Sequence, residues 1–168
     1  MNVYLSGPID LVSDHGSGWR DDVKRHFKDN KSILFFDPVS PYVFNGIDRA
    51  KSDYIVKTNV AAINECDLVA IRMMKDQVSI GTPVEMYQAL VIKKPFVICT
   101  DMESVYMTYF IARALEVVDN TERLCTAILN AEIQTRIKKE KEEQSKEMNE
   151  KMDLLKVFGD SLCDVQKH

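Results

Sequence analysis

The stretch that decides the fold runs from Asp67-Leu-Val-Ala-Ile-Arg-Met73 to Ser79-Ile-Gly-Thr-Pro-Val-Glu85. Its first part is short, mostly apolar and typical of a buried strand, and residues 86–92 have a helical pattern. Loops beyond the carboxyl ends of parallel strands are where α/β proteins bind ligands. The stretch therefore predicts a strand, a loop and a helix that together place the Glu85 carboxylate at a ligand-binding edge.

The same stretch also fits a purely structural role for Glu85. Thr82-x-x-Glu85 has the form of a capping box, with Thr82 as the N-cap and Pro83 at the favoured first helical position. A capping glutamate folds back onto the N-cap amide, whereas a catalytic glutamate points its oxygens into a cleft. The local sequence leaves both roles open.

Strand and helix patterns alternate along the rest of the chain. Further strand patterns lie at residues 3–5, 33–36, 96–99 and 117–118, and helical patterns at 19–28, 48–65, 83–92 and 104–115. This alternation predicts a flavodoxin-like or Rossmann-like α/β fold, with five parallel strands in the order 2-1-3-4-5 and helices on both faces. That order brings the loop Ser6-Gly7-Pro8-Ile9 beside the loop that contains Ser79, Gly81 and Thr82.

The composition changes toward the C-terminus. Between residues 132 and 153 Glu and Lys dominate, which predicts a long, solvated terminal helix. We expect an α/β domain over residues 1–120 and a charged helical extension over residues 121–168.

Bulk composition narrows the class of protein. The chain has 168 residues, 45% of them hydrophobic, and a formal net charge of −4, which offers no general attraction to nucleic acid or to an anionic membrane. No apolar run approaches the roughly 20 residues that span a bilayer, and no signal-peptide pattern is present. The cysteines are widely spaced and the histidines lack metal-ligand spacing. We expect a cytoplasmic protein with no cofactor and no metal.

Three further residues have two open roles each. Tyr4 is either a core aromatic or a phenol that hydrogen-bonds Glu85 and keeps it ionised. Asn59 is the polar member of an apolar helical face formed with residues 55, 62, 63 and 66, so its amide binds either a backbone group or a ligand. We expect Arg20 to be a solvated arginine at a helix start, with a contact to a substrate phosphate as the alternative.

Five short motifs occur in order between Met1 and Tyr109: Tyr4-Leu-Ser-Gly-Pro8, Phe36-Asp37-Pro38, Asn59-x3-Ile63-x3-Asp67, Ser79-x-Gly-Thr-x-x-Glu85-x3-Ala89 and Lys94-Pro95. Together they resemble the nucleoside 2-deoxyribosyltransferase family and, within it, the nucleoside 5′-monophosphate N-glycoside hydrolases. The resemblance does not extend beyond residue 121.

The resemblance implies an enzyme that cleaves the N-glycosidic bond of a (deoxy)nucleoside 5′-monophosphate and releases free base and sugar phosphate. Glu85 would attack the anomeric carbon and form a glycosyl-enzyme, with Tyr4 positioning it. Asn59 would be a third catalytic residue, which holds the base or a sugar hydroxyl by hydrogen bonds. It also implies a homodimer or larger homo-oligomer in which Thr108 completes a neighbour's site. The remaining substrate contacts would come from Ser6, Gly7, Pro8, Ile9, Asp37, Ser79, Gly81 and Thr82.

Two positions depart from the transferases, which typically carry aspartate where this chain has Asn59 and Ser79. Asn59 cannot donate a proton as a general acid. A serine at position 79 does not repel a phosphate near a helix N-terminus, and the nucleotide-hydrolysing relatives carry serine there. Ser79 therefore favours a nucleoside 5′-monophosphate over a free nucleoside. With the net charge of −4, we expect a small-molecule partner and no nucleic acid polymer.

Three alternatives stay open. A nucleoside 2-deoxyribosyltransferase would exchange bases instead of releasing one to water. A non-catalytic nucleotide-binding or sensing module is motivated by Asn59, which removes an expected acid. An NAD-glycohydrolase-like domain is the third, although the sequence contains no dinucleotide-binding fingerprint.

Overall fold

A computed structural model describes residues 1–9, 12–39, 49–77, 79–103 and 107–165, with side chains described as far as residue 152. The chain divides into a first unit, Met1–Ala131, and a second unit that begins at Glu132. The first unit holds the sheet and every candidate site residue. Residues 121–131, which the sequence analysis grouped with the C-terminal extension, belong to this unit because Leu124 and Ile128 are buried in its core.

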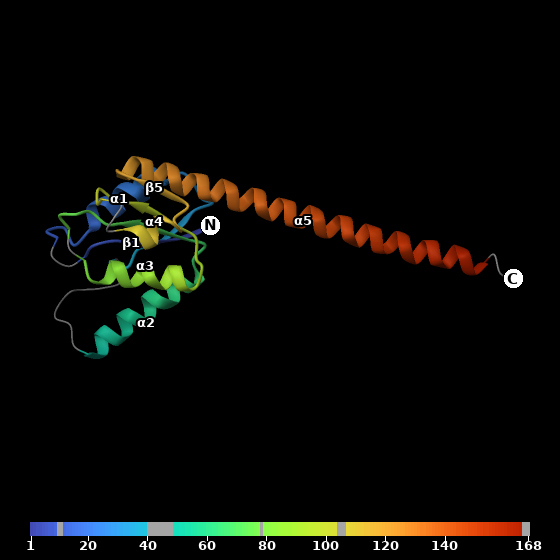
Figure 1. The fold of residues 1–168 in the computed structure, drawn as a ribbon, viewed down its shortest axis with the longest axis horizontal. Coiled ribbons are helices and arrows are strands. Elements are labelled where there is room, and N and C mark those ends of the chain that lie inside the picture. Colours follow the sequence, from blue (N-terminus) through green and yellow to red (C-terminus); the bar gives the residue numbers. More distant parts are fainter. Residues whose placement is uncertain (10–11, 40–48, 78, 104–106, 166–168) are drawn as a thin grey trace. The chain divides into compact units, whose positions relative to one another are not determined.

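Five parallel strands form one sheet in the order β2-β1-β3-β4-β5. Figure 1 labels the central strand β1 and the edge strand β5, together with the helices. They are β1 (Asn2–Ser6), β2 (Leu34–Phe36), β3 (Leu68–Arg72), β4 (Phe96–Cys99) and β5 (Glu116–Val118). In the register, Tyr4 of β1 lies opposite Phe36 of β2 and Val69 of β3. The predicted fold class and strand order are confirmed.

The helices are α1 (Ser17–His26), α2 (Arg49–Glu65), α3 (Gly81–Val91), α4 (Thr108–Ile111) and α5 (Thr121–Val165). The helix predicted at residues 104–115 was too long. Its first three residues lie outside the described residues, and α4 ends at Ile111. The chain leaves the helix because the Leu115 amide donates to the Phe96 carbonyl at 2.8 Å, which draws the chain onto the sheet edge as β5.

Alternate residues of β1 face different helices, because successive side chains of a strand point to opposite faces. Val3 and Leu5 pack in the same core cluster as buried residues of α1 and the start of α5, such as Trp19 and Leu124. Tyr4 packs on the other face with residues of α2 and α3. Ser6 shares the face of Tyr4 by this alternation, so β1 presents two hydroxyl groups toward the side covered by α2 and α3.

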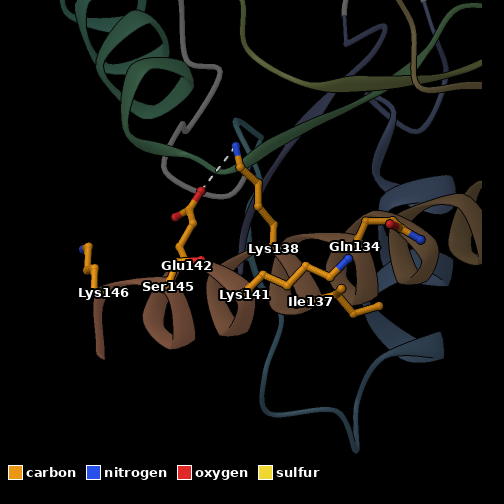
Figure 2. Close-up of a pocket in the computed structure, with 7 residues that line it drawn as sticks. All are labelled: Gln134, Ile137, Lys138, Lys141, Glu142, Ser145 and Lys146. Carbon is orange, nitrogen blue, oxygen red and sulfur yellow. Dashed lines mark ion pairs between the residues drawn. The ribbon is translucent and has the colours of Figure 1, made fainter. Parts of the chain in front are cut away.

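The second unit consists of the remainder of α5 in its described part. From residue 138 to residue 152 every side chain is exposed, as the Glu- and Lys-rich composition predicts. Figure 2 shows a surface hollow here that is lined by α5 residues alone and crossed by an ion pair of 3.8 Å between Lys138 and Glu142. All its lining residues come from one helix, so we assign it no binding role.

Gly16 and Gly81 provide a matched test of backbone constraint near the candidate site. Gly16 has a φ of 70°, and a Cβ there would lie 2.0 Å from the Pro8 carbonyl oxygen, whereas a Cβ at Gly81 would meet nothing within 4 Å. We expect Gly16→Ala to lower the free energy of unfolding by about 1–3 kcal/mol. Gly81→Ala should change it by less than about 1 kcal/mol. Urea denaturation followed by circular dichroism measures both, and equal losses would contradict the constraint at Gly16.

Candidate active site

The Glu85 carboxylate is the point where three elements of the first unit meet. Tyr4 Oη donates a hydrogen bond to Glu85 Oε1, and Ser6 Oγ donates one to Oε2, each at 2.6 Å. Asn59 Nδ2 of α2 donates to Oε1 at the longer distance of 3.4 Å. Both oxygens of a half-buried carboxylate on α3 are therefore bound by side chains of β1, with α2 adding a third donor.

Of the two roles left open for Glu85, the capping box does not form. α3 begins at Gly81, one residue before the expected N-cap, and the Glu85 oxygens bind Tyr4 and Ser6. Ser79 takes the capping role instead, because its Oγ accepts the Thr82 amide at 3.1 Å and lies 2.7 Å from Thr82 Oγ1. Ser79 therefore caps the helix, and the Glu85 carboxylate is left to face β1.

Two opposing effects set the charge state of Glu85. Burial raises the pKa of the Glu85 carboxyl above its ordinary value. Hydrogen bonds from Ser6 and Tyr4, the positive charge of Arg20 and the Asn59 amide oppose that rise, because each favours the ionised form. The site therefore holds a desolvated carboxylate supported by donors, which is an environment suited to a nucleophile or a general base.

The prediction that Arg20 is solvated was wrong. Its side chain is fully buried, and its Nε lies 3.4 Å from Asp37 Oδ1. Asp37 also pairs with Lys24 at 2.9 Å and accepts the Val39 amide at 3.0 Å. Asp37, expected to contact substrate, is thus occupied by protein groups on both of its oxygens.

The structure places the other expected residues in three groups. Gly7 and Pro8 are buried and Ile9 half-buried in the loop after β1. A Cβ on Gly7 would lie 2.7 Å from the Trp19 ring, so glycine allows this loop to pack against the indole. Gly81 is exposed at the start of α3, and Thr108 is exposed at the start of α4.

Sequence reasoning missed two features that periodicity could have found. Ser6 was assigned to a substrate loop, although its spacing of two from Tyr4 places both side chains on one face of β1. Arg20 lies three and seven residues before Val23 and Phe27, which are buried, so helical spacing places it on the buried face of α1.

Within the described part of the chain, no helix is long and apolar enough to cross a membrane. In that same part, no group of three or more His, Cys, Asp or Glu side chains could hold a metal ion.

The raised pKa of Glu85 predicts how a neutral variant changes stability with pH. A carboxyl whose pKa is higher in the folded state binds more protons there than in the unfolded chain. Stability is therefore lost as the pH rises from the ordinary value of 4.5 through the folded-state pKa. In Glu85→Gln the side chain does not titrate, so the variant does not lose this stability. As the pH rises, the free energy of unfolding of the variant should therefore increase relative to that of the wild type. The increase should be about 1.4 kcal/mol for each unit by which folding raises the Glu85 pKa.

Urea denaturation at pH 4 and pH 8 measures this difference. Glu65→Gln, which changes an exposed glutamate at the end of α2, is the matched control and should show no such gain. If the wild type instead became more stable relative to Glu85→Gln from pH 4 to pH 8, the raised pKa would be contradicted.

Comparison with known proteins gives one family. Residues 1–102 match the family model described as "Nucleoside 2-deoxyribosyltransferase like". No curated protein matches the sequence significantly.

Solved structures share the fold at low sequence identity. A conserved protein from Enterococcus faecalis V583 has a TM-score of 0.62 at 16% identity, over 77% of this chain and 98% of that one. The 2-deoxyribosyltransferase from Bacillus psychrosaccharolyticus has a TM-score of 0.58 at 14% identity, over 74% and 90%. A CMP N-glycosidase from Clostridium botulinum has a TM-score of 0.53 at 15% identity, over 76% and 98%.

The family match covers 102 of the 168 residues and includes Tyr4, Asn59 and Glu85. The expected resemblance is therefore confirmed, and the chain belongs to the nucleoside 2-deoxyribosyltransferase-like family of enzymes.

Proposed function

We propose that the protein is an N-glycosidase that cleaves the bond between base and sugar in a (deoxy)nucleoside 5′-monophosphate. The observation that carries this proposal is the Glu85 carboxylate, bound through both oxygens by Tyr4 and Ser6 at 2.6 Å. Two hydroxyl donors hold the carboxylate in one orientation, which reduces the entropy lost when it reacts. Family membership supplies the bond type, because deoxyribosyl transfer acts on the same N-glycosidic linkage.

The proposed reaction has two steps. Glu85 attacks the anomeric carbon as the C–N bond breaks, and the base leaves with the electron pair of that bond and acquires a proton. Water then attacks the anomeric carbon of the glycosyl-enzyme, which releases the sugar phosphate and restores the carboxylate. Asn59 is adjacent to the carboxylate and is suited to hold the base or a sugar hydroxyl, since an amide offers both a donor and an acceptor.

The N-terminus of α3 is the proposed position for the phosphate. The first turn of α3 carries no acidic residue, so the positive end of the helix dipole is not neutralised locally. Gly81 leaves open space there. Because Ser79 binds the Thr82 amide and hydroxyl, we infer that it contributes by fixing this turn without adding negative charge.

We also propose a homo-oligomer, in which Thr108 of one subunit completes the site of another. Four apolar residues on α3 and at its start, spaced three or four apart, are exposed: Ile80, Val84, Tyr87 and Val91, with exposed fractions of 82%, 63%, 63% and 57%. Exposed apolar stripes of this kind are typical of protein interfaces. The stripe lies on the helix that carries Glu85, so assembly and catalysis would involve the same element.

Product analysis tests the proposed reaction. Incubation with ribo- and deoxyribonucleoside 5′-monophosphates should release free base, with a kcat/KM at least about 10-fold above that for the matching nucleosides because of the phosphate contact. Glu85→Gln should lower kcat by about 10³-fold or more. An added acceptor base distinguishes the hydrolase from the transferase, because only a transferase forms a new nucleotide. Wild-type turnover by Glu85→Gln would overturn the assignment.

Light scattering coupled to gel filtration tests the homo-oligomer. Val84→Glu places a charge in the α3 stripe and should convert the assembly to monomers, since a buried unpaired charge is strongly unfavourable. Glu65→Gln again serves as the control. A wild-type protein that is monomeric at micromolar concentration would contradict the proposal.

A further inference from the structure

We propose that Arg20 is a positioning residue for the Glu85 carboxylate and acts from behind it, by binding the carbonyl groups on either side of Ser6. This role presupposes that Glu85 is the reacting group of the proposed function. The Arg20 side chain is fully buried, so we assign it no direct contact with the substrate.

The Arg20 guanidinium binds four backbone carbonyl oxygens. Nε donates to Leu5 O at 3.4 Å and Nη2 donates to Gly7 O at 2.9 Å. Nη1 donates to Gly16 O at 2.7 Å and to Pro8 O at 3.2 Å. An arginine presents its five N–H donors in one rigid plane, which a lysine ammonium cannot reproduce.

These contacts hold the backbone on both sides of a residue that binds Glu85. Leu5 and Gly7 flank Ser6, whose Oγ donates to Glu85 Oε2 at 2.6 Å. When both neighbouring carbonyls are bound to one rigid group, the backbone of Ser6 is fixed and so is the direction of its hydroxyl. Arg20 thereby determines where one of the two carboxylate oxygens is held.

The charge of Arg20 adds a second effect. Asp37 is the nearest carboxylate to Arg20 among the described ion pairs, but it also binds Lys24 at 2.9 Å, so its negative charge is shared between two cations. The Trp19 ring lies 4.7 Å from the guanidinium carbon and helps to exclude water. Arg20 thus retains a positive potential in a poorly screened setting, and that potential favours the ionised form of Glu85.

Other titratable groups around this network are accounted for. Tyr4 of β1 faces both Glu85 and Arg20, and Asp14 in the turn before α1 adds a weaker attraction to Arg20. The α2 neighbour of Glu85 is the neutral Asn59. Among the leading influences on the pKa of Glu85, Arg20 is the one that carries a positive charge.

Two substitutions separate the charge of Arg20 from its shape. Arg20→Gln removes the charge and keeps two N–H donors, whereas Arg20→Lys keeps the charge and loses the planar donor set. Lys24→Gln is the matched control, because it removes a neighbouring cation of α1 that binds Asp37 without binding a loop carbonyl. Protein with carbon-13 in its glutamate carboxyl groups reports the titration of Glu85 by NMR, assigned by the signal lost in Glu85→Gln.

We expect Arg20→Gln to raise the titration midpoint of Glu85, and the acid limb of kcat/KM, by at least about half a pH unit. Arg20→Lys should restore most of the midpoint while kcat/KM stays at least about 10-fold below wild type, because Ser6 is no longer fixed. Lys24→Gln should raise the midpoint by less than Arg20→Gln does, because Asp37 then pairs with Arg20 alone, and should leave kcat/KM near the wild-type value, because Lys24 binds no carbonyl beside Ser6. Tyr4→Phe is the positive control. It removes a hydrogen-bond donor to Glu85 and should also raise the titration midpoint.

The outcomes separate this proposal from the proposed function. A wild-type midpoint in Arg20→Gln would overturn the positioning role whether or not the enzyme turns over. If the wild type released no base but Arg20→Gln still shifted the titration, the proposed function would fail and the positioning of the carboxylate would stand. If Arg20→Gln did not fold, wild-type kcat/KM in Arg20→Lys would show that Arg20 is only structural.

Discussion

The site depends on two hydrogen bonds that join β1 to α3 through the Glu85 carboxylate. They link residues 81 and 79 positions apart, so both depend on the packing of α3 against the face of the sheet that carries Tyr4 and Ser6. Each requires the two-residue period of a strand, which places Tyr4 and Ser6 on one face. The central position of β1, between β2 and β3, then sets these hydroxyls at the carboxyl edge of the sheet. The hydrogen-bond donors offset part of the free-energy cost of burying the carboxylate, and the raised pKa of Glu85 shows that part of the cost remains.

Much of the fold could be predicted, because apolar runs and their spacing determine it. Four strands are mostly apolar and alternate with helical patterns, so a parallel sheet followed from the sequence, and its order followed from the number of strands. The contact between Tyr4 and Glu85 could be anticipated because this order brings two loops together. The length of α4 could not, since it is set by the long-range bond from Leu115 to Phe96.

The errors at the site have a common physical cause. The local sequence leaves both a capping and a catalytic role open for Glu85, and the partners offered by β1 decide between them. Asn59 illustrates the same limit, because its amide donates to Glu85, a carboxylate on a different helix. A solvated Arg20 was expected because arginine is rarely buried without partners. Here the partners are backbone carbonyls, which no side-chain pattern reveals.

The α3 helix carries Glu85 toward the sheet and an apolar stripe toward the outside, and Val84 of that stripe is its immediate neighbour. Successive residues of a helix differ by about 100° in direction. Deletion of a single residue between the Ser79 cap and Glu85 would therefore turn the carboxylate outward to the exposed position of Val84, and insertion of one residue would turn it to the buried position of Met86. The number of residues in this turn is thus as strictly constrained as their chemical identity, and changes in length here would be far more damaging than most changes in composition.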